Sequence, residues 1–141
     1  MGQYQFDPSV NLISLDVQIE GKPSTRPAYL RMGVDTGASF TIIPWHVVES
    51  LGYDPAHHSD RIRFMTGSGM DMAPLLTVQA IEVLGVRQRH VPVLCHDLPQ
   101  RSLVDGLLGL SFLRHCRLAI NFPRGVLELR KGSPIRGDKW E

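Results

Sequence analysis

A single short run of residues combines a carboxylate with the turn chemistry of a catalytic loop. Asp35, Thr36 and Gly37 follow directly after an alternating apolar segment, so the carboxylate stands at the end of a rigid strand. Thr36 can hydrogen-bond within the loop, and Gly37 lets another backbone approach closely. A carboxylate held in this way can take and return protons in general acid–base catalysis. The same three residues also form ordinary turns, so their chemistry depends on the elements around them.

The elements around this run are predicted to be short strands. Apolar and polar residues alternate at 13–19, 28–34, 76–83 and 86–95, which is the period of half-buried strands. One helix is predicted at 44–51, with Pro44 at its first position, and a shorter one at 111–115, with Ser111 as its N-cap. Short strands separated by turns, in a chain of 141 residues, indicate one all-β domain that is a barrel or a sandwich.

A glycine-rich turn lies in the middle of the chain. A strand that begins near Ile62 reaches Met65 and Thr66, and a second strand continues from Met70. The residues between them, Gly67-Ser68-Gly69, predict the tip of a hairpin. The tip is too short for a phosphate-binding loop and has no Lys after it, so nucleotide binding is not expected here.

Three segments together resemble one protein family. Residues 32–43, with the sequence MGVDTGASFTII, are similar to the active-site strand and loop of retropepsin-like aspartic proteases. Residues 105–113, with the sequence DGLLGLSFL, resemble the family's second motif. In that motif two hydrophobic residues and a glycine come directly before a helix. The tip at 67–69 falls where the family carries its flap, and residues 120–129 resemble its closing strands. The resemblance covers residues 11–130.

The resemblance implies a closed, single-lobe acid-protease barrel with one or two short helices. It implies an N-terminal arm at 1–10, the protease domain at 11–130 and a polar C-terminal tail at 131–141. Asp35 is then the catalytic residue. The expected supports of the catalytic loop are Thr36, Gly37, Ala38 and Ser39. The expected flap and substrate-binding residues are Met65, Thr66, Gly67, Ser68, Gly69 and Met70, and the expected pocket residues are Asp105, Leu107, Leu108 and Gly109.

Two positions separate this chain from the retroviral members of the family. Those enzymes commonly have an Asp where Ser39 stands and an Arg where Leu110 stands, and the two residues form an ion pair that braces the dimer. Both are replaced here. The helix predicted at 44–51 and the segment at 112–116 look more like bacterial members and the DNA-damage-inducible eukaryotic type. A viral substrate preference is therefore not expected.

The chemistry of the family needs two aspartates, and Asp-Thr-Gly occurs once in this chain. Asp105 lacks a following Thr-Gly, so we interpret it as a carboxylate at a pocket rim or as a cap. The second catalytic group is then Asp35 of another copy, in a symmetric homodimer. The two carboxylates would share one proton and activate a water that attacks a peptide bond, best at acidic pH.

Two alternatives to this mechanism stay open at the level of the sequence. In the first, Asp35 pairs with Asp105 within one chain, which predicts an active monomer. In the second, the same fold serves as a peptide-binding or dimerisation module with little catalysis. The intact Asp-Thr-Gly favours the enzyme, whereas the missing ion pair leaves room for weak dimerisation.

Composition excludes several other classes of function. Fifteen Lys and Arg residues balance fourteen Asp and Glu residues, so no nucleic-acid or membrane-surface binding is expected. No apolar stretch approaches the roughly 18 residues of a membrane span, and no signal peptide is recognisable, which predicts a cytoplasmic protein unless the chain belongs to a larger one. His57 and His58 lack a third ligand, so no metal or other cofactor is expected. The partners expected are a second copy and an extended peptide or protein substrate.

Overall fold

The computed structural model describes residues 2–133 as ten strands, two short α-helices and one 3-10 turn. The predicted polar tail at 131–141 therefore lies mostly outside the described residues. The strands are β1 (Gly2–Gln5), β2 (Ser14–Glu20), β3 (Ala28–Val34), β4 (Thr41–Ile43), β5 (Arg61–Thr66), β6 (Gly69–Val83), β7 (Val86–Cys95), β8 (Gly106–Leu108), β9 (Cys116–Asn121) and β10 (Val126–Lys131). The helices are α1 (Trp45–Ser50) and α2 (Leu110–Leu113), and the 3-10 turn is Pro55–His57.

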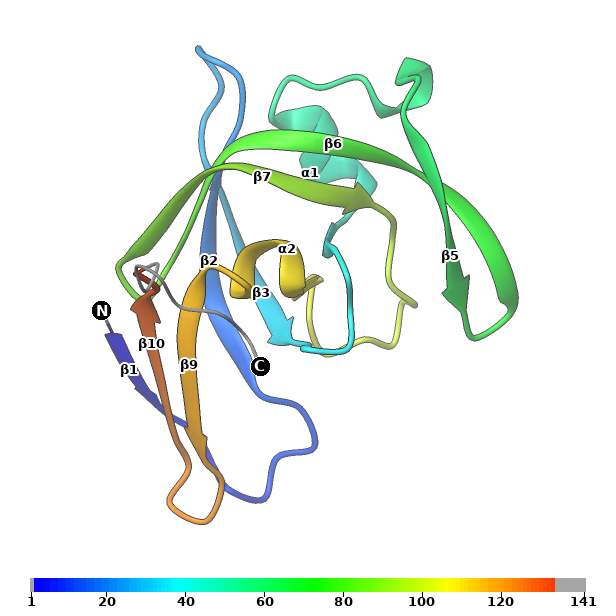
Figure 1. Cartoon of the computed structure of the whole chain (residues 1–141). Helices are drawn as coiled ribbons and strands as arrows, with labels where there is room; N and C mark the ends of the chain where they lie inside the picture. Colours follow the sequence, from blue (N-terminus) through cyan, green and yellow to red (C-terminus); the bar gives the residue numbers. More distant parts are fainter. Residues whose placement is uncertain (1, 134–141) are drawn as a thin grey trace, which may run out of the picture.

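Six of the strands close into a barrel (Figure 1). They follow the order β2-β3-β8-β4-β7-β6, and a second pairing of β2 with β6 joins the two ends of the sheet. Alternating side chains fill the interior, because Leu15, Val17 and Ile19 of β2 are all buried while the residues between them are more exposed. The predicted all-β barrel with two short helices is confirmed.

The short strand β8 is threaded between β3 and β4. It pairs in parallel with β3, with Met32 beside Gly106 and Val34 beside Leu108, and antiparallel with β4. A Cβ atom on Gly106 would overlap with the carbonyl oxygen of Ile42, so only glycine lets the strands come this close. Residues from two distant parts of the sequence thus form one continuous sheet under the end of β3.

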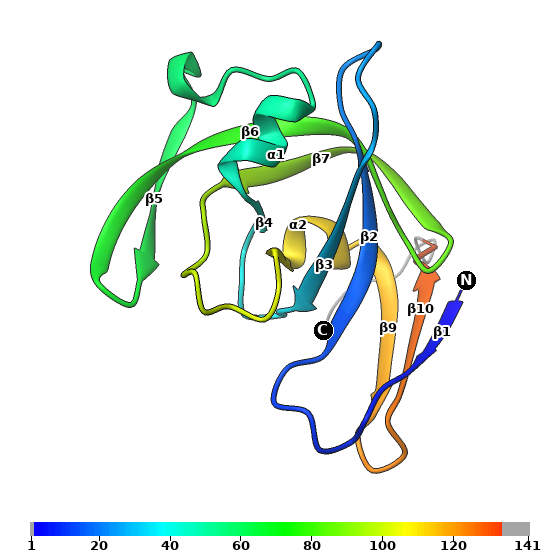
Figure 2. The same cartoon turned by 180° about the vertical axis from the view of Figure 1, so that it is seen from behind.

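A separate three-stranded sheet contains the first and the last strands of the described residues (Figure 2). β10 lies in its centre, with β1 on one side and β9 on the other, and all neighbours are antiparallel. The first residues of the predicted N-terminal arm therefore form a strand, which pairs residue Gly2 with Leu129 and Gln5 with Val126 of the same chain.

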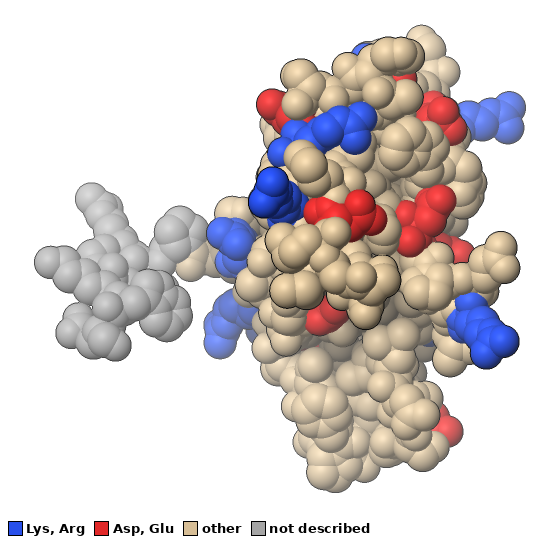
Figure 3. Space-filling view, turned by 90° about the vertical axis from the view of Figure 1, so that its right-hand side faces the viewer, with Lys and Arg blue, Asp and Glu red and all other residues tan. Residues whose placement is uncertain are grey.

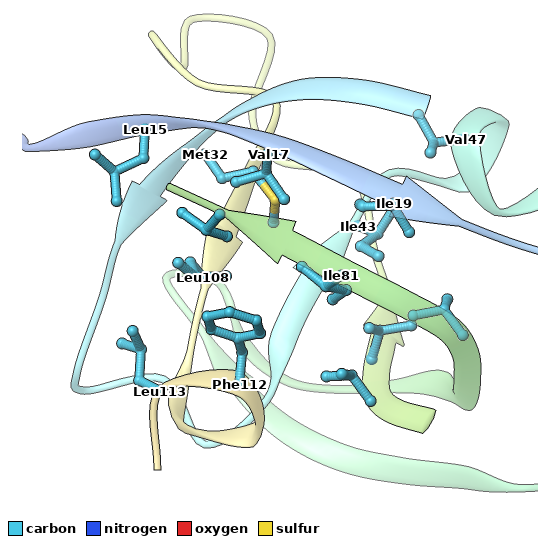
Figure 4. Packing of buried hydrophobic residues seen from close by; sticks show 14 of the residues in the cluster. Leu15, Val17, Ile19, Met32, Ile43, Val47, Ile81, Leu108, Phe112 and Leu113 are labelled. Atoms are coloured by element: carbon cyan, nitrogen blue, oxygen red, sulfur yellow. The ribbon is translucent and has the colours of Figure 1, made fainter. Parts of the chain in front are cut away.

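One hydrophobic core holds the barrel and the helices together (Figure 4). Phe112 of α2 is fully buried and packs among side chains of the surrounding strands, including Leu108. α1 lies close to its predicted position and buries Val47 and Val48. The prediction of Ser111 as an N-cap is wrong: α2 begins at Leu110, Gly109 is its N-cap, and the Ser111 hydroxyl has a different partner. Among the described residues, no helix is long and apolar enough to cross a membrane.

Candidate active site

Asp35 is the first residue after β3, and the backbone on both sides of it is fixed. The Asp35 amide donates to the carbonyl of Leu108 at 3.0 Å, so the threaded strand β8 supports the aspartate directly. The preceding amide, of Val34, donates to the carbonyl of Ile13 at 2.8 Å. Asp35 is half-buried, and its place is set by two segments that are far apart in the sequence.

The loop after Asp35 turns around the carboxylate itself. The Gly37 amide donates to Asp35 Oδ1 at 2.9 Å, and the Ala38 amide donates to the Asp35 carbonyl at 3.2 Å. This is an Asx-type turn, which orients the carboxylate without a partner from elsewhere in the chain. Thr36 and Ser39 are exposed, and no hydrogen bond of the Thr36 hydroxyl is found within the described residues. The loop therefore presents Thr36 to the outside.

A buried pair of hydroxyls braces the far end of the loop. Thr41 Oγ1 accepts from the Gly109 amide at 3.1 Å, and Ser111 Oγ accepts from the Thr41 amide at 2.9 Å. The Leu110 amide donates to the Ala38 carbonyl at 2.8 Å. These contacts join the Asp35 loop to the start of α2. Sequence reasoning missed the role of Thr41 and Ser111, because each partner lies about 70 residues away.

Two of the expected pocket residues lie behind the loop. Leu108 is fully buried in the core, and Gly109 packs against the loop so closely that a Cβ atom there would lie 2.6 Å from the Phe40 carbonyl oxygen. Leu107, on the other hand, is half-buried beside Leu12 and Gly33. Leu108 and Gly109 are placed to support the Asp35 loop and not to contact a substrate side chain.

Asp105 is held at the other end of β8 from Asp35. Its amide donates to the Arg31 carbonyl at 2.8 Å, and its Oδ2 accepts from the Arg31 amide at 2.8 Å. Leu108, three residues later, is the residue that contacts Asp35. In the register of the two strands Asp105 lies level with Arg31, four residues before Asp35. At about 3.3 Å per residue the two aspartates stand roughly 13 Å apart along the parallel strands. They are too distant to share a proton, which speaks against a dyad within one chain.

The Arg31 side chain links three strands next to these hydrogen bonds between Asp105 and the Arg31 backbone. Its guanidinium donates to Ser14 Oγ at 2.8 Å, to Asp16 Oδ1 at 3.0 Å and to the Tyr4 hydroxyl at 2.6 Å. The hydrogen bond to Tyr4 is the main cause that raises the pKa of Arg31 above its usual value. β1 is thereby tied to the strand that carries Asp35.

β5 and β6 form the predicted hairpin, whose tip is Gly67-Ser68. Thr66 closes the turn: its Oγ1 donates to the Gly69 carbonyl at 2.9 Å and accepts from the Ser68 amide at 3.3 Å. The Met65 and Met70 side chains face each other across the strands and are 74% and 60% exposed. The opposite face carries Phe64, whose ring meets the edge of His96 at 4.8 Å between centroids.

The hairpin tip and the end of β3 point the same way in two opposite views (Figures 1 and 2). A hollow of about 460 Å³ lies elsewhere, on the outer face of β2 and β3, and its lining includes Tyr29, Arg31 and Glu82. None of its lining residues belongs to the Asp35 loop or to the hairpin tip. This hollow is therefore separate from the Asp35 loop.

The other titratable groups of residues 2–133 give no second catalytic arrangement. His57 Nδ1 lies 2.8 Å from Asp54 Oδ2 on the surface, and the described residues contain no group of three side chains placed to hold a metal ion. Burial raises the pKa of the Cys95 thiol to about 12 and also raises that of Cys116. Both cysteines are free, and their thiols are protonated near neutral pH, so neither has the thiolate of a reactive nucleophile.

The closed barrel and the supported Asp-Thr-Gly loop define the class of single-lobe, retropepsin-like proteins. Among solved structures, a retropepsin-like aspartic protease from Rickettsia conorii matches with a TM-score of 0.65 and 19% identity, over 90% of this chain and 98% of that one. At that identity the likeness establishes the fold.

The family follows from the sequence match. The model of the aspartyl protease family matches residues 15–112, and the chain belongs to this family. An uncharacterised protein from the cobV 5' region of a Sinorhizobium species is 31% identical over 84 residues, which is 60% of this chain. The matched part is 35% of that relative, so the chain spans about a third of its length.

Proposed function

We propose that this protein is a homodimeric aspartic endopeptidase in which Asp35 of each copy supplies one half of the catalytic dyad. The observation that carries the proposal is the fixed loop around a lone Asp35. Its backbone is tied to β8 and its carboxylate is oriented by the Gly37 amide, yet among the described residues no hydrogen bond joins it to a second carboxylate, and Asp105 is held at the other end of β8. A two-fold axis beside the exposed Thr36 supplies the missing group.

The two Asp35 carboxyl groups hold one proton and one water between them, since like charges this close do not both stay ionised. The ionised carboxylate takes a proton from the water as its oxygen attacks the scissile carbonyl carbon. The protonated carboxyl group donates to the developing oxyanion. The proton taken from water then passes to the leaving amine as the C–N bond breaks. The loop contributes by keeping both oxygens oriented before substrate arrives.

The substrate is an extended segment of peptide or protein. The hairpin tip at 67–69 points in the same direction as the end of β3, so it can cover a strand that lies across Asp35. Met65 and Met70 are exposed on one face of the hairpin and offer adaptable apolar contacts. We therefore expect a preference for apolar side chains next to the cleaved bond rather than for a single residue type.

The first prediction concerns Asp35. Asp35→Asn should lower cleavage of a mixed peptide library by at least about a thousandfold, because the amide can neither take the proton from water nor share one with its partner. The library is incubated across pH 3–7 and the products are identified by mass spectrometry. The parent should cleave best in the acidic part of this range.

Asp105→Asn is the matched control for this experiment. An Asn oxygen can still accept the hydrogen bond from the Arg31 amide, so we expect activity close to that of the parent. Equal loss in both variants would instead support a dyad within one chain. A parent that dimerises and binds peptides without cutting any of them would support the binding module and overturn the proposal.

A further inference from the structure

We propose that the hollow on the outer face of β2 and β3 binds an organic cation, namely a guanidinium or ammonium group on an apolar stem. Arginine and lysine side chains of a polypeptide carry such a group, and so do free alkylamines. The volume of the hollow is about 460 Å³, within the range of roughly 300–1,000 Å³ that is typical of small-molecule sites. Its lining includes Asp16 and Gln18 of β2, Tyr29 and Arg31 of β3, Glu82 of β6, and Leu84 of the β6–β7 turn.

The aromatic ring and the carboxylate of this hollow stand in one row across three strands. Val17 is buried in the core, so its neighbours Asp16 and Gln18 point to the outer face of β2. In the register of the sheet, Gln18 lies between Tyr29 of β3 and Glu82 of β6. Two strand spacings separate the ring from the carboxylate, which is roughly 10 Å. A stem that lies over Gln18 can therefore reach both groups.

β1 and the β6–β7 turn form one rim of the hollow. A Cβ atom on Gly2 would overlap with the carbonyl oxygen of Leu84, so the two segments are in direct contact. The N-terminal end of β1 lies next to this turn in both opposite views (Figures 1 and 2). Leu84 and the ring of Tyr29 thus provide apolar surface in a hollow whose other named residues are polar or charged.

Arg31 is already engaged and does not make the hollow a site for anions. Each of its three guanidinium nitrogens donates a hydrogen bond, to Ser14 Oγ, to Asp16 Oδ1 and to the Tyr4 hydroxyl. The Asp16 side chain is 90% exposed and meets Arg31 through Oδ1, which leaves Oδ2 facing solvent. A ligand in the hollow therefore meets a carboxylate beside a guanidinium whose charge is offset.

Glu82 gives the hollow its excess of negative charge. Arg87 stands opposite Glu82 across β6 and β7, but its guanidinium donates to Glu20 at 2.9 and 3.0 Å. No ion pair of Glu82 is found within residues 2–133. Two carboxylates and one guanidinium leave one negative charge for a ligand to balance. The ring of Tyr29, which is 73% exposed, can bind the same cation through its face.

The charge that attracts the ligand is confined to the hollow. Over the whole chain, bases exceed acids by one charge. On the face seen in Figure 3, both signs of charge are present and neither covers the surface. No broad negative field therefore gathers cations around the protein, and binding depends on the residues that line the hollow.

The hollow is also distant from the proposed catalytic group. Tyr29 lies six residues before Asp35, which is roughly 20 Å along β3 at about 3.3 Å per residue. A cation bound beside Tyr29 leaves the Asp35 loop free. The inference thus goes beyond the proposed function and does not depend on it.

NMR titration of the isotopically labelled full chain tests the site with two probes. One is a pentapeptide, Gly-Gly-Arg-Gly-Gly with blocked ends, and the other is agmatine, a free alkylguanidine with the same head group. Shifts should be centred on residues 16–18, 29–31 and 82–84. A peptide with citrulline in place of arginine keeps the shape without the charge, and it should bind at least about tenfold more weakly than the arginine peptide. The tighter binder of the two probes identifies the source of the cation.

Substitutions in the hollow separate its two contacts. Glu82→Gln should raise the probe dissociation constant at least about fivefold, because an amide does not balance the positive charge. Tyr29→Leu keeps apolar bulk without the aromatic face and should raise it about two- to fivefold. Glu49→Gln is the matched control, since Glu49 is exposed on α1 outside the hollow, and its constant should equal that of the parent. Circular dichroism checks that all three variants fold.

Two results would overturn the inference: a parent that binds neither probe, or a folded Glu82→Gln variant that binds them as tightly as the parent. Asp35→Asn should bind both probes as the parent does. Cleavage that is lost in Asp35→Asn together with failure of both probes to bind would leave the proposed function standing without this site. Binding by a parent that cleaves no peptide would keep the site and overturn the proposed function.

Discussion

At the scale of single residues, the Asp35 loop depends on glycines that allow close contact between backbones. Gly106 is the sharpest case, because it lies where β8 passes between β3 and β4, next to the carbonyl of Ile42. A methyl group at this position has no space unless a strand moves. Since Leu108 of the same strand holds the Asp35 amide, any shift of β8 is passed to the carboxylate.

Gly106→Ala should lower the free energy of unfolding by at least about 2 kcal/mol, because overpacking between paired strands forces the backbone apart. Chemical denaturation followed by circular dichroism measures the change. Gly67→Ala is the matched control: a Cβ atom there meets nothing within 4 Å, so we expect a change below about 0.5 kcal/mol. Equal stability of the two variants would show that β8 is free to move.

At the scale of elements, the loop is held by the β4–α2 contact. Thr41 is fully buried, and its hydroxyl accepts from the Gly109 amide while its own amide donates to Ser111. This contact takes the place of side-chain capping at the start of α2, because Gly109 has no side chain to cap with. Removing the hydroxyl leaves a buried amide without a partner.

Thr41→Val should therefore cost about 1–3 kcal/mol of stability, although the side chain keeps its shape. Thr77→Val makes the same change at an exposed position of β6 and should be close to neutral. Both are measured by urea denaturation at one pH. A Thr41 variant as stable as the Thr77 variant would show that the buried Thr41 hydroxyl does not stabilise the β4–α2 contact.

The sequence was sufficient for the elements whose pattern is local. Alternation of apolar residues predicted β2, β3 and β7, and the Gly67-Ser68-Gly69 run predicted the hairpin tip, because each pattern repeats within a few residues. β1 was not predicted, since Gly2–Gln5 contains one large apolar residue and its partner β10 comes more than 120 residues later. Ser111 was assigned to a cap for the same reason: its true partner, Thr41, is distant in sequence.

In the candidate site, too, local features could be predicted from the sequence and contacts between distant residues could not. Asp35 and its Asx-type turn follow from three adjacent residues, so motif and composition were enough to find them. The hydrogen bonds between Asp105 and the Arg31 backbone depend on the register of β3 with β8, which cannot be read from the sequence.

At the scale of the whole molecule, charge is too evenly balanced to drive association. The net charge is +1, and Ser39 and Leu110 stand where retroviral relatives commonly carry an ion pair. Dimerisation through apolar side chains should respond little to salt, since screening acts on charges.

We expect the dimer dissociation constant to change by less than about threefold between roughly 0.05 and 0.5 M sodium chloride. Sedimentation velocity at several salt concentrations measures it. A dissociation constant that rises tenfold or more with salt would indicate an interface held by ion pairs. It would count against dimerisation through apolar side chains.

The threading of β8 between β3 and β4 also has a consequence for the order in which the molecule can be made. Asp35 is synthesised before the strand and helix that support it, which end at Leu113. A chain that emerges from the ribosome in order cannot complete the support of Asp35 until that segment is free. We expect the Asp35 loop of the nascent protein to stay without its support until Leu113 has left the ribosome, so that the proposed activity appears only after the barrel has closed.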